Sequence, residues 1–137
     1  MGNPEKFSID KIVGFYEGIE IVKDNTKLST TTAYRLGRLS DYCRAVVRTF
    51  EKTKEKERKE AALKINDLKK GYDKADEEQK KLVDEQVRDI NNAFVEKINE
   101  LAEQEEQISV PEFKLEDFEN KDVPVKFFSL LGDVIKE

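Results

Sequence analysis

The feature that most constrains the fold is a long segment without a helix breaker. No Pro or Gly occurs between Gly37 and Gly71, and apolar residues recur at helical spacing on either side of a charged run at residues 51–60. Alternating spacings of three and four residues are typical of a helix packed against another helix. We therefore predict a helix from about residue 30 to about residue 70, with an apolar seam made of Leu36, Leu39, Cys43, Val46, Phe50, Ala61, Ile65, Leu68 and Tyr72.

A second long helix is predicted directly after Gly71. Basic residues followed by Gly are typical of a helix C-terminus. Asp76 and Gln79 have the spacing of a capping box, which would begin the next helix. Two long helices with so short a connection run antiparallel. We expect a helical hairpin over about residues 30–105, whose second seam consists of Val83, Val87, Ile90, Phe94, Ile98 and Leu101.

The two ends of the chain complete the predicted fold. Ser8 is a suitable N-cap for a helix over about residues 8–23. Residues 108–118 read as an extended segment that Pro111 confines to a sheet edge or an irregular stretch. Pro124 suits the first turn of a closing helix that continues to about residue 136. The sequence thus predicts a mainly α fold: one helical domain, residues 1–137, in which a long antiparallel hairpin follows an N-terminal helix and precedes an extended tail and a short helix.

Charge is abundant and unevenly distributed. Charged residues make up 40% of the chain, and the net charge is −5. Residues 1–70 carry 16 Lys/Arg and 11 Asp/Glu, whereas residues 71–137 carry 9 and 19. Either the two halves pair with each other, or the protein presents two faces of opposite sign. We find no signal-peptide pattern and no apolar stretch of the roughly 20 residues that cross a bilayer, so we expect no membrane partner.

The residues that usually carry catalysis or bind metals are scarce. The chain has no His, and its single Cys43 lies on the apolar seam, where we expect a buried, unreactive thiol. Asp84, Glu85 and Asp89 lie close together on the predicted third helix, but its inward positions are Val and Ile. We interpret these carboxylates as a solvated face rather than a metal site. The sequence therefore predicts a protein that is not an enzyme and has no metal or cofactor.

Basic residues on the second helix are the first candidate interaction surface. Arg44, Arg48, Lys52 and Lys56 recur every four residues, and Arg44 and Arg48 also form one constellation with Tyr34, Arg35, Arg38 and Tyr42. Such a stripe could follow a phosphate backbone. Alternatively, its cations face water or acidic residues of the third helix: Glu85, Asp89, Glu96 and Glu100. The acidic chain has no recognised nucleic-acid module, which disfavours nucleic acid as the partner.

Phe127 and Phe128 are the second candidate interaction surface. In one interpretation they fold back and close the open end of the hairpin, near Phe50 and Leu101. In the other, they lie on an exposed helix that docks in a groove of a partner.

Gly37 also has two interpretations, because a Gly inside a helix costs about 1 kcal/mol relative to Ala. Either another helix approaches closely there, or the fold tolerates a weak position.

The order of these segments resembles a group of phage proteins. A short helix precedes Lys-Leu-Ser-Thr-Thr-Thr-Ala-Tyr-Arg-Leu-Gly-Arg-Leu at residues 27–39, which opens the long charged helix. The hairpin, the extended Ile-Ser-Val-Pro-Glu-Phe-Lys-Leu-Glu-Asp-Phe at residues 108–118 and the closing helix fit the same layout. Together they resemble small tailed-phage proteins of unknown function with a central charged helical hairpin. The resemblance covers most of the chain and carries no catalytic residue.

This resemblance implies a location in the host cytoplasm or the virion and a role in protein–protein interaction. The first hypothesis is a non-catalytic structural or assembly accessory, whose protein partner is a copy of itself, in a homo-oligomer, or another protein. The second hypothesis is an inhibitor or modulator of a host protein, which would use an acidic face that mimics nucleic acid.

Overall fold

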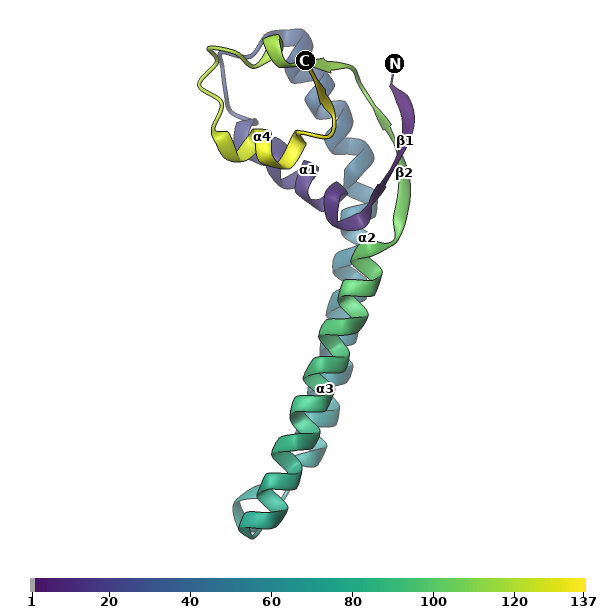
Figure 1. Cartoon of the computed structure of the whole chain (residues 1–137), viewed down its shortest axis with the longest axis vertical. Helices are drawn as coiled ribbons and strands as arrows, with labels where there is room; N and C mark the ends of the chain where they lie inside the picture. The colour runs from purple at the N-terminus through teal and green to yellow at the C-terminus, as the bar shows by residue number, and fades with distance from the viewer. Residues whose placement is uncertain (1) are drawn as a thin grey trace. The chain divides into compact units, whose positions relative to one another are not determined.

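A computed structural model describes residues 2–137 (Figure 1). The chain is mainly helical, as predicted, and divides into two compact units. One unit contains the residues up to Thr49 together with Glu103–Glu137, and the other is Phe50–Ala102. The elements in chain order are β1 (Asn3–Ser8), α1 (Ile9–Val22), α2 (Thr30–Leu68), the 3-10 turn η1 (Tyr72–Lys74), α3 (Glu77–Glu103), β2 (Glu105–Val110), β3 (Phe113–Lys114), the 3-10 turn η2 (Leu115–Asp117), α4 (Val125–Leu131) and β4 (Ile135–Lys136).

The ends of the helices follow the capping residues read from the sequence. The Ser8 hydroxyl accepts a hydrogen bond from the backbone N–H of Lys11 at the start of α1. Asp76 and Gln79 form the predicted capping box at the start of α3, with each side chain accepting a hydrogen bond from the other residue's backbone N–H. Gly71 adopts φ = +77°, the left-handed conformation that ends the first arm of the hairpin. The local signals for the hairpin are therefore confirmed.

The hairpin unit is formed by the parts of α2 and α3 between Phe50 and Ala102, and Figure 1 shows the two helices side by side. Its seam residues are half-buried, and no residue in this unit is buried. The sequence shows no apolar seam residue between residues 51 and 60. In the structure, Thr53 and Glu57 are half-buried there and continue the seam. The seam thus runs through the charged segment with polar residues in place of apolar ones.

The other unit contains the hydrophobic core. The seam residues of α2 that belong to it, Leu36, Leu39 and Cys43, are buried together with one face of α1. The remaining core residues come from the C-terminal third of the chain: Ile108, Val110, Phe113, Phe118, Phe127, Leu131 and Val134. Residues 50–102 contribute nothing to this core.

Two short sheets connect distant segments of the first unit. Strand β1 pairs antiparallel with β2, so that Asn3 lies opposite Val110 and Ser8 opposite Glu105. Strand β1 was not predicted from the sequence. The predicted extended segment, residues 108–118, pairs with β1 up to Val110 and stops before Pro111, as expected for a residue without a backbone N–H. Strands β3 and β4 are parallel and pair Phe113 with Ile135.

The C-terminal helix is shorter than predicted. Helix α4 ends at Leu131, and Ile135 belongs to β4 rather than to a helix that continues to about residue 136. Pairing with Phe113 holds Ile135 in an extended conformation, and Ile135 packs against the core. Helix α4 itself lies beside α1 (Figure 1). At Gly18 of α1, an added Cβ would lie 3.2 Å from Cβ of Leu130, so the glycine permits this close approach.

Candidate functional site

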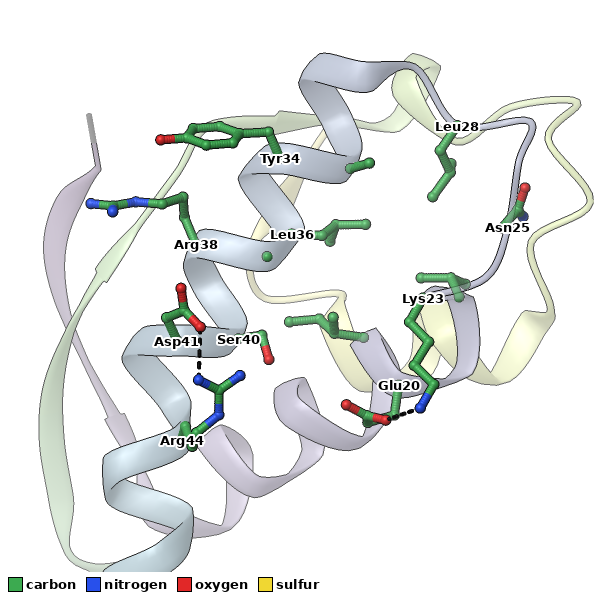
Figure 2. Close-up of a pocket in the computed structure, with 14 residues that line it drawn as sticks. Glu20, Lys23, Asn25, Leu28, Tyr34, Leu36, Arg38, Ser40, Asp41 and Arg44 are labelled. Carbon is green, nitrogen blue, oxygen red and sulfur yellow. Dashed lines mark ion pairs between the residues drawn. The ribbon is translucent and has the colours of Figure 1, made fainter.

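The first candidate site is a groove between the end of α1 and the N-terminal part of α2 (Figure 2). It encloses a cavity of about 390 Å³, within the range of sites that hold small ligands or partner side chains. Apolar side chains from α1, α2 and the loop between them line it: Ile19, Val22, Leu28, Ala33 and Leu36. Apart from Ala33, these side chains belong to the buried core, so the groove reaches from the surface down to core residues.

Ion pairs border this groove (Figure 2). Lys23 Nζ lies 3.0 Å from a carboxylate oxygen of Glu20, and Arg44 Nη1 lies 2.9 Å from a carboxylate oxygen of Asp41. The hydrogen bond with Glu20 raises the pKa of Lys23. A hydrogen bond with Tyr16 and the charge of Asp41 raise the pKa of Arg44. These two cations are therefore already neutralised by residues of their own unit.

Gly37 lies in the wall of the groove. A Cβ added at this position would meet no atom within 4 Å. The interpretation that another helix approaches closely at Gly37 is therefore wrong. The position is open, and the missing side chain widens the groove at a cost of about 1 kcal/mol in helix propensity.

A second hollow, of about 480 Å³, lies on α2 next to the segment that follows β2. The arginine–tyrosine group, Tyr34, Arg35, Arg38 and Tyr42, lines it together with Gly2, Thr31, Pro111 and Glu112. Tyr34 and Arg38 border both hollows, and Figure 2 shows their side chains extending away from Leu36 and Leu28. The sequence placed these four residues in one constellation with Arg44 and Arg48, which do not line this hollow. It gave no sign of the hollow itself, because Pro111 and Glu112 are distant in the chain.

The arginines of this second hollow have neutral partners. Arg35 Nη1 donates to the backbone oxygen of Glu112 at 3.2 Å, and Arg38 Nη2 donates to the hydroxyl of Tyr42 at 2.8 Å. The guanidinium carbon of Arg38 also lies 5.3 Å from the centre of the Tyr42 ring, a cation–π distance. Neither arginine forms an ion pair with a described carboxylate. Their charge remains available to a ligand.

The predicted basic stripe is divided between the two units. Arg44 and Arg48 fall in the first unit, and Lys52 and Lys56 fall in the hairpin unit. Arg44 pairs with Asp41 of its own helix rather than with an acidic residue of α3. The other three side chains are exposed and form no ion pair within the described residues. Their role as an interaction surface stays a prediction.

Phe127 and Phe128, the second candidate interaction surface, have different environments in the structure. Phe127 is buried in the core with 0% of its surface exposed, and its ring centre lies 4.9 Å from that of Phe118. Phe127 is therefore a core residue, and the interpretation that it docks on a partner is wrong for it. Phe128 is half-buried and packs edge-on against Phe127, with 5.6 Å between ring centres. The aromatic cluster holds α4 on the core of its own unit, where α4 packs against α1, so the internal interpretation holds for α4.

Cys43 and Asp84, two further side chains that could carry chemistry, have structural environments. Burial raises the pKa of the Cys43 thiol to about 12, which keeps it protonated and unreactive near neutral pH. Asp84, one of the three clustered carboxylates, accepts a hydrogen bond from the Tyr72 hydroxyl at 3.0 Å.

Residues 2–137 contain no group of three or more His, Cys, Asp or Glu side chains placed to hold a metal ion. Across the same range, no helix combines the length and the apolar character needed to cross a membrane.

Comparisons of the chain with known protein families, with curated proteins and with solved structures give no match.

Proposed function

We propose that this chain is a non-catalytic protein–protein interaction protein of the structural or assembly type. Its hairpin, Phe50–Ala102, associates through the seam with the hairpin of a second copy. In this proposal the unit up to Thr49 and Glu103–Glu137 folds around its own core, while the hairpin supplies the interface.

The observation that carries the proposal is the incomplete burial of the seam. Helix α3 contains no buried residue, although Val83, Val87 and Ile90 repeat at the spacing of a packed helix. Two helices alone cover each other's apolar stripe on one side only, whereas a four-helix bundle covers it on both. A second hairpin would remove from water the apolar surface that the seam still exposes, at about 25 cal/mol per Å².

Exposed apolar side chains on the same unit support an interface there. Leu63, Leu82 and Val95 are 65%, 56% and 53% exposed. Each is single, and single exposed apolar residues are common on protein surfaces. Leu82 and Val95 flank the seam of α3, because each adjoins a seam residue in the sequence. Leu63 lies two residues from both Ala61 and Ile65, on the face of α2 opposite the seam.

The wider biological setting stays a prediction. The resemblance to small tailed-phage proteins favours a virion or assembly accessory, found in the virion or the host cytoplasm. The second hypothesis, an inhibitor of a host protein with an acidic face, predicts a monomer or dimer that binds one host protein. A monomer at every concentration would therefore favour the second hypothesis.

The dependence of thermal stability on protein concentration tests the proposal. If only the associated form has a covered seam, the midpoint Tm rises with concentration by mass action. The test variant Val87→Asp places a charge in the seam, and the control Asn92→Asp adds the same charge at an exposed position of α3. We expect Tm to rise over a hundredfold range of concentration in the wild type and the control, and to be lower and constant in Val87→Asp. A wild-type Tm that is constant over this range would contradict the proposal.

A further inference from the structure

We propose that the arginine–tyrosine group on α2 binds a short segment of a partner protein in which a carboxylate stands next to a large apolar side chain. This inference goes beyond the proposed function, because it assigns a second surface, in the other unit, to a partner of different chemistry. It rests on two uncompensated arginines, on the exposed aromatic surface beside them and on the open groove at Gly37.

Arg35 and Arg38 have no carboxylate partner within the described residues. In the same unit Lys11, Lys23, Lys27 and Arg44 have one, whereas Arg48 also has none. Arg35 and Arg38 instead use one donor each on a neutral oxygen, so most of the five N–H donors of each guanidinium remain free. Guanidinium groups bind carboxylates through two parallel hydrogen bonds. The two arginines therefore form a receptor for a carboxylate of the partner.

Two tyrosines, Tyr34 and Tyr42, line the hollow together with these arginines. Tyr34 is 67% exposed, an unusual position for a large aromatic ring with no packing partner in the core. Tyr42 is half-buried and packs against the core, and it holds Arg38 by a hydrogen bond and a cation–π contact. Arg38 is thereby ordered before the partner arrives, which lowers the entropic cost of binding. Tyr and Arg are also the residue types that contribute most to binding at protein interfaces.

The groove between α1 and α2 lies next to the arginine hollow. Tyr34 and Arg38 border it as well as the arginine hollow, so the two hollows adjoin along α2. The groove is lined by Ile19, Leu28 and Leu36 and is open at Gly37 (Figure 2). A segment that places a carboxylate on the two arginines can therefore place an adjacent apolar side chain in the groove.

The charge balance favours a protein segment over a nucleic acid. Among the residues that line the arginine hollow, Arg35 and Arg38 are positive and Glu112 is negative, a balance of one positive charge. A nucleic-acid strand gains its affinity by contacts with several phosphates. One surplus charge fits a single carboxylate, and the chain as a whole carries −5.

The test is a selection from a bead-displayed library of random heptapeptides, with the full-length protein as bait. We expect the enriched peptides to contain Asp or Glu next to Leu, Ile or Phe. The peptide enriched most is then measured in solution by fluorescence anisotropy. Its affinity should fall at least tenfold in the double variant Arg35→Ala with Arg38→Ala, and also in Gly37→Leu, which fills the groove. The variant Arg88→Ala, which removes an exposed arginine of the other unit, serves as the matched control and should bind like the wild type.

Other outcomes would overturn the proposal. The first is an absence of enrichment, and the second is enrichment of peptides without acidic residues. The third is binding that all these variants retain. Binding of a fluorescein-labelled oligothymidylate of twelve nucleotides is measured in parallel. If the wild type binds it and the double arginine variant does not, the partner is a single-stranded nucleic acid and not a protein segment. Circular dichroism and Tm show whether each variant is folded, and the altered side chains are exposed, so the fold should persist.

Discussion

The ammonium group of Lys97 lies 3.3 Å from the carboxylate of Glu57, and this ion pair connects α3 to α2 across the hairpin. The two partners differ in exposure, because 61% of the Lys97 side chain is exposed and only 26% of the Glu57 side chain. Glu57 thus occupies a seam position in a segment where every neighbour in sequence from Lys54 to Glu60 is exposed. The seam contains a carboxylate where a stable interface would favour an apolar side chain.

The substitution Glu57→Leu should stabilise the hairpin. An exposed ion pair contributes about 0–1 kcal/mol, whereas a leucine that is mostly buried in the seam contributes roughly 1–2 kcal/mol. We expect a higher free energy of unfolding by about 1 kcal/mol in urea denaturation. Glu51→Leu changes an exposed residue of the same helix and should leave the stability unchanged, so an equal gain in both variants would contradict the seam position of Glu57.

Replacement of Gly37 and of Gly71 by Ala should have opposite effects. Gly37 lies inside α2 with open space around it, so Gly37→Ala should raise the free energy of unfolding by about 1 kcal/mol. Gly71 has φ = +77°, where an L side chain is strained, so Gly71→Ala should lower it by about 1 kcal/mol. Denaturation in urea measures both. Effects of the same sign would mean that one of the two backbone conformations is wrong.

The packing of α4 on α1 should depend on Gly18. A Cβ at this position would collide with the side chain of Leu131, and the Cβ of Leu130 would lie only 3.2 Å away. We expect Gly18→Ala to lower the free energy of unfolding by about 1–3 kcal/mol, as in overpacked cores. At Gly14 the nearest atom, Cδ2 of Leu130, lies 3.4 Å away, so Gly14→Ala should be neutral or stabilising. Equal stability of the two variants would contradict the close packing of α4 against α1 at Gly18.

The thiol of Cys43 should be unreactive until the protein unfolds. Burial raises its pKa from 9.0 to about 12, so the folded state holds the proton more tightly than the unfolded state. Its contribution to stability is therefore complete below about pH 9 and decreases as the pH rises toward 12. We expect Ellman's reagent at pH 8 to modify the native protein only at the rate of unfolding, and the denatured protein at once. Rapid modification of native protein would show that Cys43 lies outside the core.

The helices could be predicted from the sequence because their signals are local. The spacing of Val83, Val87 and Ile90 indicated one face of α3, and Gly71 marked the end of the first arm. The caps at Ser8 and Asp76 were confirmed for the same reason, since a cap depends on residues within one turn.

Features that depend on distant residues were missed. Strand β1 contains Pro4 and lacks an alternating apolar pattern, and its pairing partner β2 begins at Glu105. The sequence left the burial of Phe127 open between two interpretations, because that burial depends on Phe118 and on α1, which the apolar spacing of α4 does not identify. The arginine hollow was missed in the same way, because Arg35 and Glu112 become neighbours only when the first unit folds.

The central claim is that the hairpins of two chains associate through their half-buried seams. The most direct test is the absolute mass of the purified protein, measured by light scattering after gel filtration at several concentrations. One chain has a mass of 15.9 kDa. The account predicts a defined oligomer whose mass is a multiple of this value and which dissociates in Val87→Asp but persists in Asn92→Asp. A mass of one chain at every concentration would contradict the claim and would favour the hypothesis of a host-protein inhibitor.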